Sequence, residues 1–357
     1  MRVFHAGIAT ILTLTLLGAT CPGALARPVR RLTHFPGVVD YWPRFSPDGT
    51  TALFSHCEIA SGCGGTATSG YWTLWKTRIR HGKPAQFLIV GDTSMTRSNW
   101  LVTSPSAADQ IAFEGVDHRG TGSSALWVLG ADGSNVRRVP LAAAVGSPSY
   151  PSWFPDGASL LITTRSAQEP GPRLARVAID TGKPLVTLTS ADVIWTGMSA
   201  VSHDGTMLAV AAQLPLAGQQ YDDTNNQIWI QAVGDPTTED LGLHQLDALQ
   251  GRAPDWSPDD QFIMFESSRG CVDGHYAIFI EAASGGEAVQ ATDCRLNANH
   301  GVWSPDGRRF LFSYAFGDPS AGRCAGGGCR GIAIAAVPAK IRALLHRAAS
   351  AASRESR

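Results

Sequence analysis

Eight polar and aromatic residues stand at related places in a repeated sequence and could together form a recognition surface. Each lies close to the start of a repeat, so a fold that arranges the repeats around an axis would bring them to one mouth of a central channel. Aromatic and arginine side chains dominate binding energy at protein interfaces. We interpret the set as ligand- or partner-binding, although its Tyr and Trp residues are equally consistent with packing between repeats. The set comprises Tyr41, Arg97, Asn99, Tyr150, Trp195, Arg252, Asn299 and His300.

Residues with acid–base chemistry are few in the same segments. Arg252, Asp255 and His300 are loose candidates for an active site in the channel, and we assign no catalytic residue. The sequence contains neither an H-E-x-x-H metal motif nor a phosphate-binding P-loop. We therefore expect no cofactor and no bound metal.

Cysteines form a second set with defined chemistry. One of the seven, Cys21, lies in an N-terminal leader, and the remaining even number is typical of disulfides in an exported protein. Zinc is the rival interpretation, but paired C-x-x-C motifs are missing. Six cysteines allow many connectivities. Short spacing, and loops expected at one face of a blade, favour Cys57–Cys63, Cys324–Cys329 and Cys271–Cys294.

One short phrase organises the chain and must position these residues. It consists of an aromatic residue, Ser-Pro-Asp-Gly, and then apolar residues two apart. Pro and Asp-Gly favour a tight turn, and apolar spacing of two is typical of a strand with one buried face. Each phrase thus predicts a hairpin. Good copies begin at Phe45, Trp153, Trp256 and Trp303, and worn copies begin at Thr103 and Val201.

The phrase recurs at intervals of 47 to 58 residues. A period of this order with several strands per repeat is typical of propeller blades. The sequence therefore predicts an all-β fold, a six-bladed β-propeller of four-stranded antiparallel blades over residues 27–338. Residues 28–33 are expected to complete blade six as its outer strand and so to close the ring; the alternative is a loose tail.

The two ends of the chain have different compositions. Residues 1–26 read as a signal peptide, because Arg2 precedes the apolar stretch Ile8–Leu17 and Ala24-Leu25-Ala26 forms a cleavage site. The apolar stretch is short for a membrane span. A lipoprotein attached through Cys21 stays an alternative. Residues 339–357 read as a basic, partly helical tail, interpreted as a solvated extension rather than a membrane-surface or partner helix.

Charge and hydropathy exclude some partners. The formal net charge of −1 gives no bulk electrostatic attraction to nucleic acid. After cleavage of the leader, no remaining apolar run is long enough to span a membrane. We expect a monomer located in the periplasm or secreted.

The repeat of Trp or Phe followed by Ser-Pro-Asp-Gly resembles the TolB-like propeller repeat, which also occurs in propeller domains of the prolyl-oligopeptidase group. The resemblance covers nearly all of residues 27–338 and implies the fold more than the function. TolB itself has an α/β domain before its propeller, for which the expected mature chain leaves no room. The peptidases have a G-x-S-x-G nucleophile elbow, which this sequence lacks.

Two functions are consistent with these features. The first, which we favour, is an exported, non-catalytic scaffold that binds a protein or peptide partner in the cell envelope. The alternative is a propeller-type lyase or hydrolase that acts on a glycan through the central channel.

Overall fold

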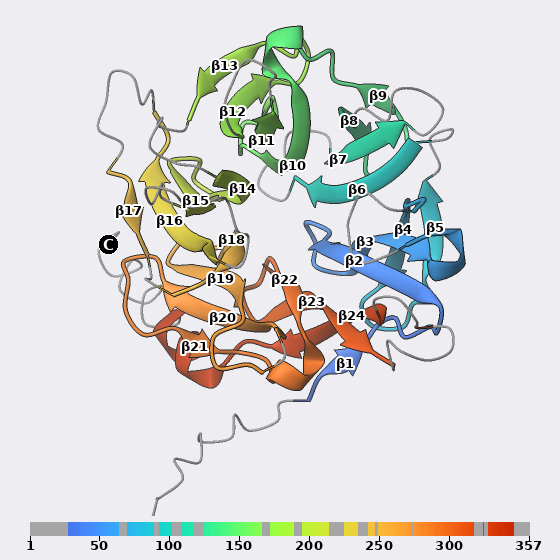
Figure 1. Cartoon of the computed structure of the whole chain (residues 1–357), viewed down its shortest axis with the longest axis vertical. Helices are drawn as coiled ribbons and strands as arrows, with labels where there is room; N and C mark the ends of the chain where they lie inside the picture. Colours follow the sequence, from blue (N-terminus) through green and yellow to red (C-terminus); the bar gives the residue numbers. More distant parts are fainter. Residues whose placement is uncertain are drawn as a thin grey trace, which may run out of the picture.

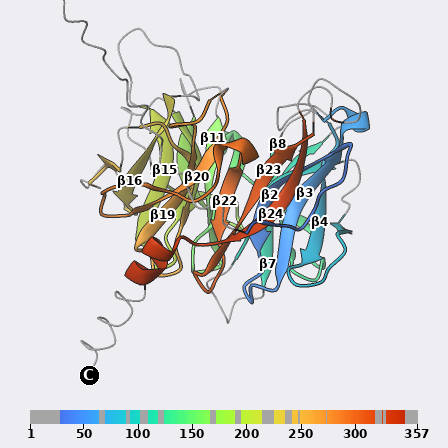
Figure 2. The ribbon, with the colours of Figure 1, turned by 90° about the horizontal axis from the view of Figure 1, so that it is seen from below.

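The fold is built from β-strands arranged as sheets around a common centre (Figure 1). The first strand of each repeat lies innermost, and the strands cross the thickness of the ring (Figure 2). The computed structural model describes residues 28–63, 70–88, 93–101, 109–117, 124–165, 172–188, 195–213, 225–234, 242–246, 249–272, 274–317, 324 and 328–345.

Each repeat contributes strands in a fixed order from the centre outwards. The innermost strands are β2 (Val38–Phe45), β6 (Thr93–Trp100), β10 (Ser147–Trp153), β14 (Trp195–Val201), β18 (Arg252–Trp256) and β22 (Asn299–Trp303). The second strands are β3 (Thr51–Glu58), β7 (Gln110–Asp117), β11 (Ser159–Arg165), β15 (Met207–Gln213), β19 (Phe262–Ser267) and β23 (Arg309–Phe316).

The outer part of each repeat is shorter. The third strands are β4 (Thr73–Arg78), β8 (Ser124–Gly130), β12 (Arg173–Ala178), β16 (Gln227–Ala232), β20 (Ala277–Ala282) and β24 (Cys329–Ala336). The outermost strands are β1 (Arg30–Arg31), β5 (Ala85–Leu88), β9 (Arg137–Arg138), β13 (Pro184–Thr187), β17 (His244–Gln245) and β21 (Val289–Gln290). Short 3-10 helices are η1 (Ile59–Ser61), η2 (Ala143–Val145) and η4 (Cys294–Leu296), and residues 339–345 form a helix.

The expected six-bladed propeller, closed by the N-terminal strand in blade six, is wrong. Four blades are separate four-stranded sheets: β6–β9, β10–β13, β14–β17 and β18–β21. The remaining strands form one eight-stranded sheet, sheet A, in the order β22-β23-β24-β2-β3-β4-β5, with β1 also paired to β24. The cause is a parallel bridge between Val39 of β2 and Arg330 of β24, which joins the first and last repeats into one sheet. A repeat period cannot reveal such pairing between repeats.

The phrase forms the hairpins for a specific chemical reason. In the last copy, the Ser304 hydroxyl donates to Asp306 at 2.5 Å and accepts from the backbone N–H of Arg309 at 3.0 Å. The backbone of Ser304 closes the same turn, accepting from Gly307 at 2.8 Å. The copy at Ser46 repeats these bonds. The serine and aspartate therefore satisfy the turn's polar groups, while glycine supplies its positive φ.

The core lies between neighbouring sheets. Trp256 packs with Ile263 and Phe265 against residues of the preceding sheet, and its indole N–H donates to the Ala200 carbonyl at 3.1 Å. Trp153 makes the equivalent bond to the Asn99 carbonyl at 3.3 Å. In these two copies, the tryptophan of the phrase thus fills the space between repeats and also donates a hydrogen bond to the neighbouring strand.

Among the described residues, contacts between successive phrase turns are of two kinds. The phrase glycine of one repeat faces the phrase proline of the repeat before it, in the pairs Gly49–Pro305, Gly205–Pro155 and Gly307–Pro258. At one junction, His203 replaces the proline and Asp260 replaces the glycine. The Asp260 carboxylate accepts from the His203 ring at 3.0 Å and from the backbone N–H groups of His203 and Asp204 at 2.8 and 3.0 Å.

The ends of the described chain pack on sheet A. The backbone N–H of Ile332 donates to the Thr33 hydroxyl at 2.8 Å. The C-terminal helix, residues 339–345, lies on the face that carries the phrase turns, where Ile341 is buried and Leu345 lies beside Gly307 (Figure 2). No helix within the described ranges is long and apolar enough to cross a membrane. The expected signal peptide and residues 346–357 of the expected tail lie outside the described residues.

Replacing Asp260 should make stability less dependent on pH. Burial alone would lower the pKa of His203, but the hydrogen bond and charge of Asp260, with the charges of Asp255 and Asp259, hold that pKa above its ordinary value. A raised pKa stabilises the fold below the unfolded-state pKa, and this stability is lost as pH rises through the folded-state pKa. We expect Asp260→Ala to cost about 1–3 kcal/mol at pH 6 and less at pH 9.

Urea unfolding at the two pH values measures this effect. The double variant His203→Pro with Asp260→Gly restores the ordinary phrase and serves as the control. It should fold with the pH-dependent contribution removed. An Asp260→Ala variant whose stability loss is the same at both pH values would contradict the assignment.

Candidate functional site

A bulge in every innermost strand shapes the channel. The pairing register between first and second strands shifts at the same place in each repeat, and there a residue other than glycine adopts φ between 48° and 52°. Bulges re-aim side chains and bend the strand. These bulge residues are Trp42, Arg97, Tyr150, Met198, Ala253 and His300.

The bulge residues meet around the axis. Together with Arg44 and a few neighbours they line a cavity of about 30 Å³, little more than one water needs. The channel is therefore narrow at this level. We call its side at the beginnings of the innermost strands the strand-start mouth, and its side at the phrase turns the turn mouth.

Two arginines at the strand-start mouth are held by buried glutamates. Arg97 pairs with Glu114, and Arg252 Nε donates to Glu266 Oε1 at 2.5 Å. Both glutamates occupy the same place in their second strands, β7 and β19. In each arginine, removal from water alone would lower the pKa, but the nearby glutamate and tyrosine raise it, so both remain charged.

An aromatic ring packs against each of these guanidinium groups. Arg97 lies 4.3 Å from the Tyr150 ring, and Arg252 lies 4.2 Å from the Tyr276 ring. Guanidinium groups stack favourably on aromatic faces. Each arginine is thus clamped between a carboxylate and a ring, which gives the mouth a pre-organised arrangement of cationic and aromatic groups.

A further group of aromatic and polar side chains lies near the axis, beside the two clamped arginines. The Tyr41 and His300 rings meet edge-on with centroids 4.7 Å apart, and Arg330 lies 5.0 Å from the Tyr41 ring while bonding Asn299. Burial, reinforced by the positive charges of Arg252, Arg44 and Arg330, lowers the pKa of His300 to about 3. The imidazole is therefore neutral at physiological pH.

The structure brings some of the eight predicted residues together and separates others. Tyr41, Arg252, Asn299 and His300 form one cluster, with Arg97 stacked on Tyr150 nearby. Asn99 lies past the bulges and lines the turn mouth instead. Trp195 begins β14, but its side chain lies outside the described residues. Their role in binding stays a prediction.

Several groups were missed from the sequence. Glu114, Glu266 and Arg330 organise the strand-start mouth, and Arg44 and His203 line the turn mouth. A signal existed for the glutamates, because both stand directly after the alternating apolar residues of their repeats. A signal existed for His203 as well, because it stands where the four good copies of the phrase have proline.

The turn mouth holds the larger cavity, of about 370 Å³. Its lining includes the next-to-last residue of every innermost strand, so that each of the six repeats contributes an equivalent position. Among the described residues, no group of three or more His, Cys, Asp or Glu side chains could hold a metal ion. The six ring positions are Arg44, Asn99, Ser152, Ala200, Asp255 and Val302.

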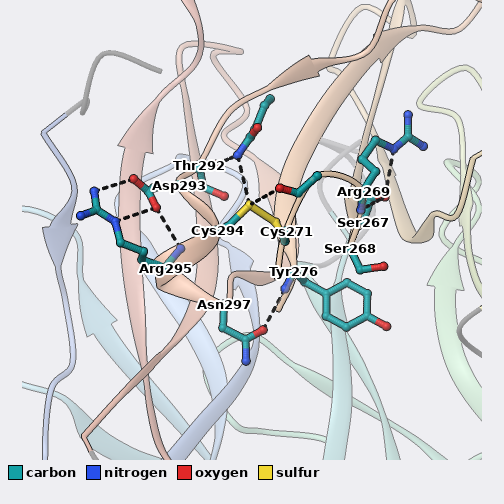
Figure 3. Close-up of a disulfide and its surroundings, with 12 residues drawn as sticks. Ser267, Ser268, Arg269, Cys271, Tyr276, Thr292, Asp293, Cys294, Arg295 and Asn297 are labelled. Atoms are coloured by element: carbon teal, nitrogen blue, oxygen red, sulfur yellow. Dashed lines mark hydrogen bonds and ion pairs between the residues drawn. A yellow bond between two sulfur atoms is a disulfide. The ribbon is translucent and has the colours of Figure 1, made fainter. Parts of the chain in front are cut away.

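Three cysteine pairs lie at disulfide distance, and they are the pairs expected from the sequence: Cys57–Cys63, Cys271–Cys294 and Cys324–Cys329. Figure 3 shows the second pair, which joins the β19–β20 loop to η4. In the same loop, the backbone N–H of Tyr276 donates to Asn297 at 3.0 Å. This cross-link therefore holds the segment that presents Tyr276 to Arg252.

Comparison with known proteins defines the fold class. No protein-family model matches the chain. No curated protein matches it significantly in sequence. Solved structures do match in fold: a TolB-type protein from Agrobacterium tumefaciens has a TM-score of 0.54 and 19% identity, over 84% of this chain and 91% of that protein.

Two further solved structures agree. TolB from Acinetobacter baumannii has a TM-score of 0.55 and 16% identity, over 84% of this chain and 64% of TolB. The tricorn protease has a TM-score of 0.51 and 17% identity, over 78% of this chain but 24% of the protease. The chain has a TolB-like β-propeller fold. Sequence identities of 16–19% support similarity of fold alone.

Removing Glu266 should be far more costly than removing an exposed acid. The side chain is fully buried and accepts from both Arg252 and the backbone N–H of His300, each at 2.5 Å. Glu266→Ala would leave a largely buried guanidinium without its counter-charge, so we expect a loss of about 3–5 kcal/mol in the free energy of unfolding. Urea unfolding measures this loss.

Glu287→Ala is the matched control, because Glu287 is exposed and its ion pair within the described ranges is with exposed Lys340. It should change stability by less than about 0.5 kcal/mol. Arg252→Leu combined with Glu266→Leu should recover much of the loss, since the uncompensated charge is then gone. Equal losses in Glu266→Ala and Glu287→Ala would disprove the clamp.

Proposed function

We propose that this protein is an exported, non-catalytic β-propeller scaffold that binds a protein or peptide partner through its strand-start mouth. The observation that carries the proposal is the pair of clamped arginines, each held between a buried glutamate and a tyrosine ring. Tyrosine and arginine are enriched at binding hot spots. Side chains fixed before binding lose little conformational entropy when a partner docks.

Exposed apolar side chains near the same mouth support a macromolecular partner. Val272 in the β19–β20 loop is 71% exposed, and Leu249, just before β18, is 54% exposed. Phe35, shortly before β2, is 49% exposed. Such residues add apolar contact area around the polar centre of the mouth, and this combination is typical of protein-binding surfaces.

The cysteine pairs support an oxidising location. Disulfides persist in periplasmic and secreted proteins and are rare in the cytosol. Three pairs at bonding distance in one chain therefore favour the periplasm or the exterior, in agreement with the leader expected from the sequence. We place the partner in the cell envelope on this basis.

Site-specific cross-linking tests the proposal. A photo-reactive amino acid at Val272 should capture one discrete protein from envelope extract, while the same group at Leu185, which is 56% exposed on the outermost strand β13, should not. With the partner purified, Tyr150→Ala should weaken binding roughly 10-fold or more, as expected of a hot-spot residue.

Equal capture at the two positions, or a Tyr150→Ala affinity equal to that of the unmodified protein, would refute a partner site at this mouth. Thermal unfolding of Tyr150→Ala should accompany the affinity measurement. A variant that unfolds like the parent and yet binds more weakly assigns the loss to the contact itself.

A glycan lyase or hydrolase is the second candidate, because Tyr41, Arg252, His300 and Arg330 converge at the axis. A neutral imidazole beside a tyrosine could move a proton, and arginines could bind acidic sugars. Under our proposal, incubation with acidic polysaccharides should give neither new unsaturated ends, followed by ultraviolet absorbance, nor new reducing ends. Turnover that is lost in His300→Ala but kept in Arg137→Gln would favour the enzyme instead.

A further inference from the structure

The turn mouth carries a ring of six equivalent side chains that differ in chemistry. Each is the next-to-last residue of its innermost strand, and each lines the cavity of about 370 Å³. Such a volume lies within the range of small-molecule sites, roughly 300–1,000 Å³. In order around the ring, the side chains are cationic, amide, hydroxyl, methyl, anionic and aliphatic, contributed by Arg44, Asn99, Ser152, Ala200, Asp255 and Val302.

The cation of this ring has unused hydrogen-bonding capacity. Arg44 donates from Nη1 to the Pro43 carbonyl at 3.3 Å, and its Nε is buried with no partner. Arg44 forms no ion pair with any residue in the described ranges, whereas Arg97 in the ring of bulge residues and Arg252 just before that ring are both paired. A partly buried guanidinium whose Nε has no partner is stabilised when an anion binds it.

Asp255, the anionic residue of the ring, likewise has unused hydrogen-bonding capacity. One oxygen of Asp255 accepts from the backbone N–H of Trp303 at 2.9 Å, which joins two repeats. Its carboxylate makes no ion pair within the described part of the chain. His203 also lines the cavity, but its ring is already bonded to Asp260.

The charges of Arg44 and Asp255 interact, although the two side chains form no direct ion pair. Removal from water lowers the pKa of Arg44 and raises that of Asp255, and in each case the opposite charge offsets only part of the effect. Both side chains line the same cavity, from strands β2 and β18. Each charge is only partly balanced by the charges around it. A ligand that carries both opposite charges would satisfy the two groups together.

We infer that the turn mouth binds a zwitterionic small molecule of the amino-acid class, with its carboxylate on Arg44 and its ammonium group at Asp255. Guanidinium and carboxylate groups match in a two-bond geometry. The side-chain amide of Asn99 lies next to Arg44 in the ring, the hydroxyl of Ser152 follows it, and both offer further donors. Ala200 and Val302 flank Asp255 and provide an apolar surface for a small side chain.

The zwitterion site and the proposed partner site depend on different charged groups, Arg44 with Asp255 at one mouth and the glutamate-paired Arg97 and Arg252 at the other. A failure to find a protein partner at the strand-start mouth would leave the zwitterion site untouched. Conversely, the absence of zwitterion binding would not affect cross-linking at Val272.

Calorimetric titration of the purified chain tests the inference with five probes. L-alanine and L-leucine carry both charges, propionate carries only the carboxylate, propylamine carries only the ammonium group, and the dipeptide Ala-Ala separates the two charges. We expect saturable one-site binding of an amino acid. Propionate and propylamine should each bind roughly 10-fold or more weakly than alanine, because one charged hydrogen-bonding contact is missing. Tighter binding of Ala-Ala than of alanine would identify a peptide rather than a free amino acid as the preferred source of the two charges.

Two variants assign the charges separately. Asp255→Asn keeps an acceptor for Trp303 and should bind alanine and propionate equally, since the ammonium partner is gone. Arg44→Met should bind alanine and propylamine equally. Loss of discrimination is a readout that general destabilisation does not produce. Arg137→Gln, at a half-exposed position on an outer strand, is the control and should bind like the parent.

Three results would overturn the inference. One is equal affinity of the parent protein for alanine and propionate, which would indicate a simple anion site. Another is retained discrimination in Asp255→Asn or Arg44→Met. The third is the absence of measurable binding of all five probes at millimolar concentration.

Discussion

Each innermost strand bends at a residue held near φ +50°, and this bend decides which side chains reach the channel. A non-glycine residue adopts this conformation only where its surroundings hold it there. Here the surroundings are the second strand on one side and the neighbouring repeats on the other. Because the bend falls at the same place in every repeat, it draws six side chains to one level and separates the residues before it from those after it.

As a result, the charged side chains that the innermost strands contribute to the described structure are paired at one mouth and unpaired at the other. Arg97 at the bend and Arg252 just before it reach glutamates of their own second strands, and their charges are satisfied inside the protein. After the bend, Arg44 and Asp255 lie on strands of different repeats and remain unpaired across the cavity. One mouth is thus a fixed surface, suited to docking, and the other has unmet charge, suited to a small ligand. The same repeat geometry produces both outcomes through the residues placed on either side of one position.

Local chemistry could be predicted from the sequence far better than relations between repeats. The Ser, Asp and Gly of the phrase each act within one turn, so their pattern predicted the hairpins, and short spacing predicted pairs such as Cys57–Cys63. The bridge between Val39 and Arg330 has no local pattern, because both residues lie in ordinary strands. The expectation of separate blades throughout was wrong for this reason.

Glu266 was missed for a similar reason, since its partner Arg252 is adjacent only across the sheet. The exchange of Pro and Gly for His203 and Asp260 was visible, but only an alignment of the turns in space shows that the two departures meet.

Sheet A also constrains how the polypeptide can fold. Its central pairing joins β2, among the first strands to emerge from the ribosome, to β24, the last one, so almost the whole length of the chain separates the two partners. Contacts between such distant segments slow folding, because the loop between them must be ordered first. Until β24 is synthesised, the edge of β2 that faces it has no partner and invites pairing with other chains. Sheet A can therefore be completed only after the last repeat is available.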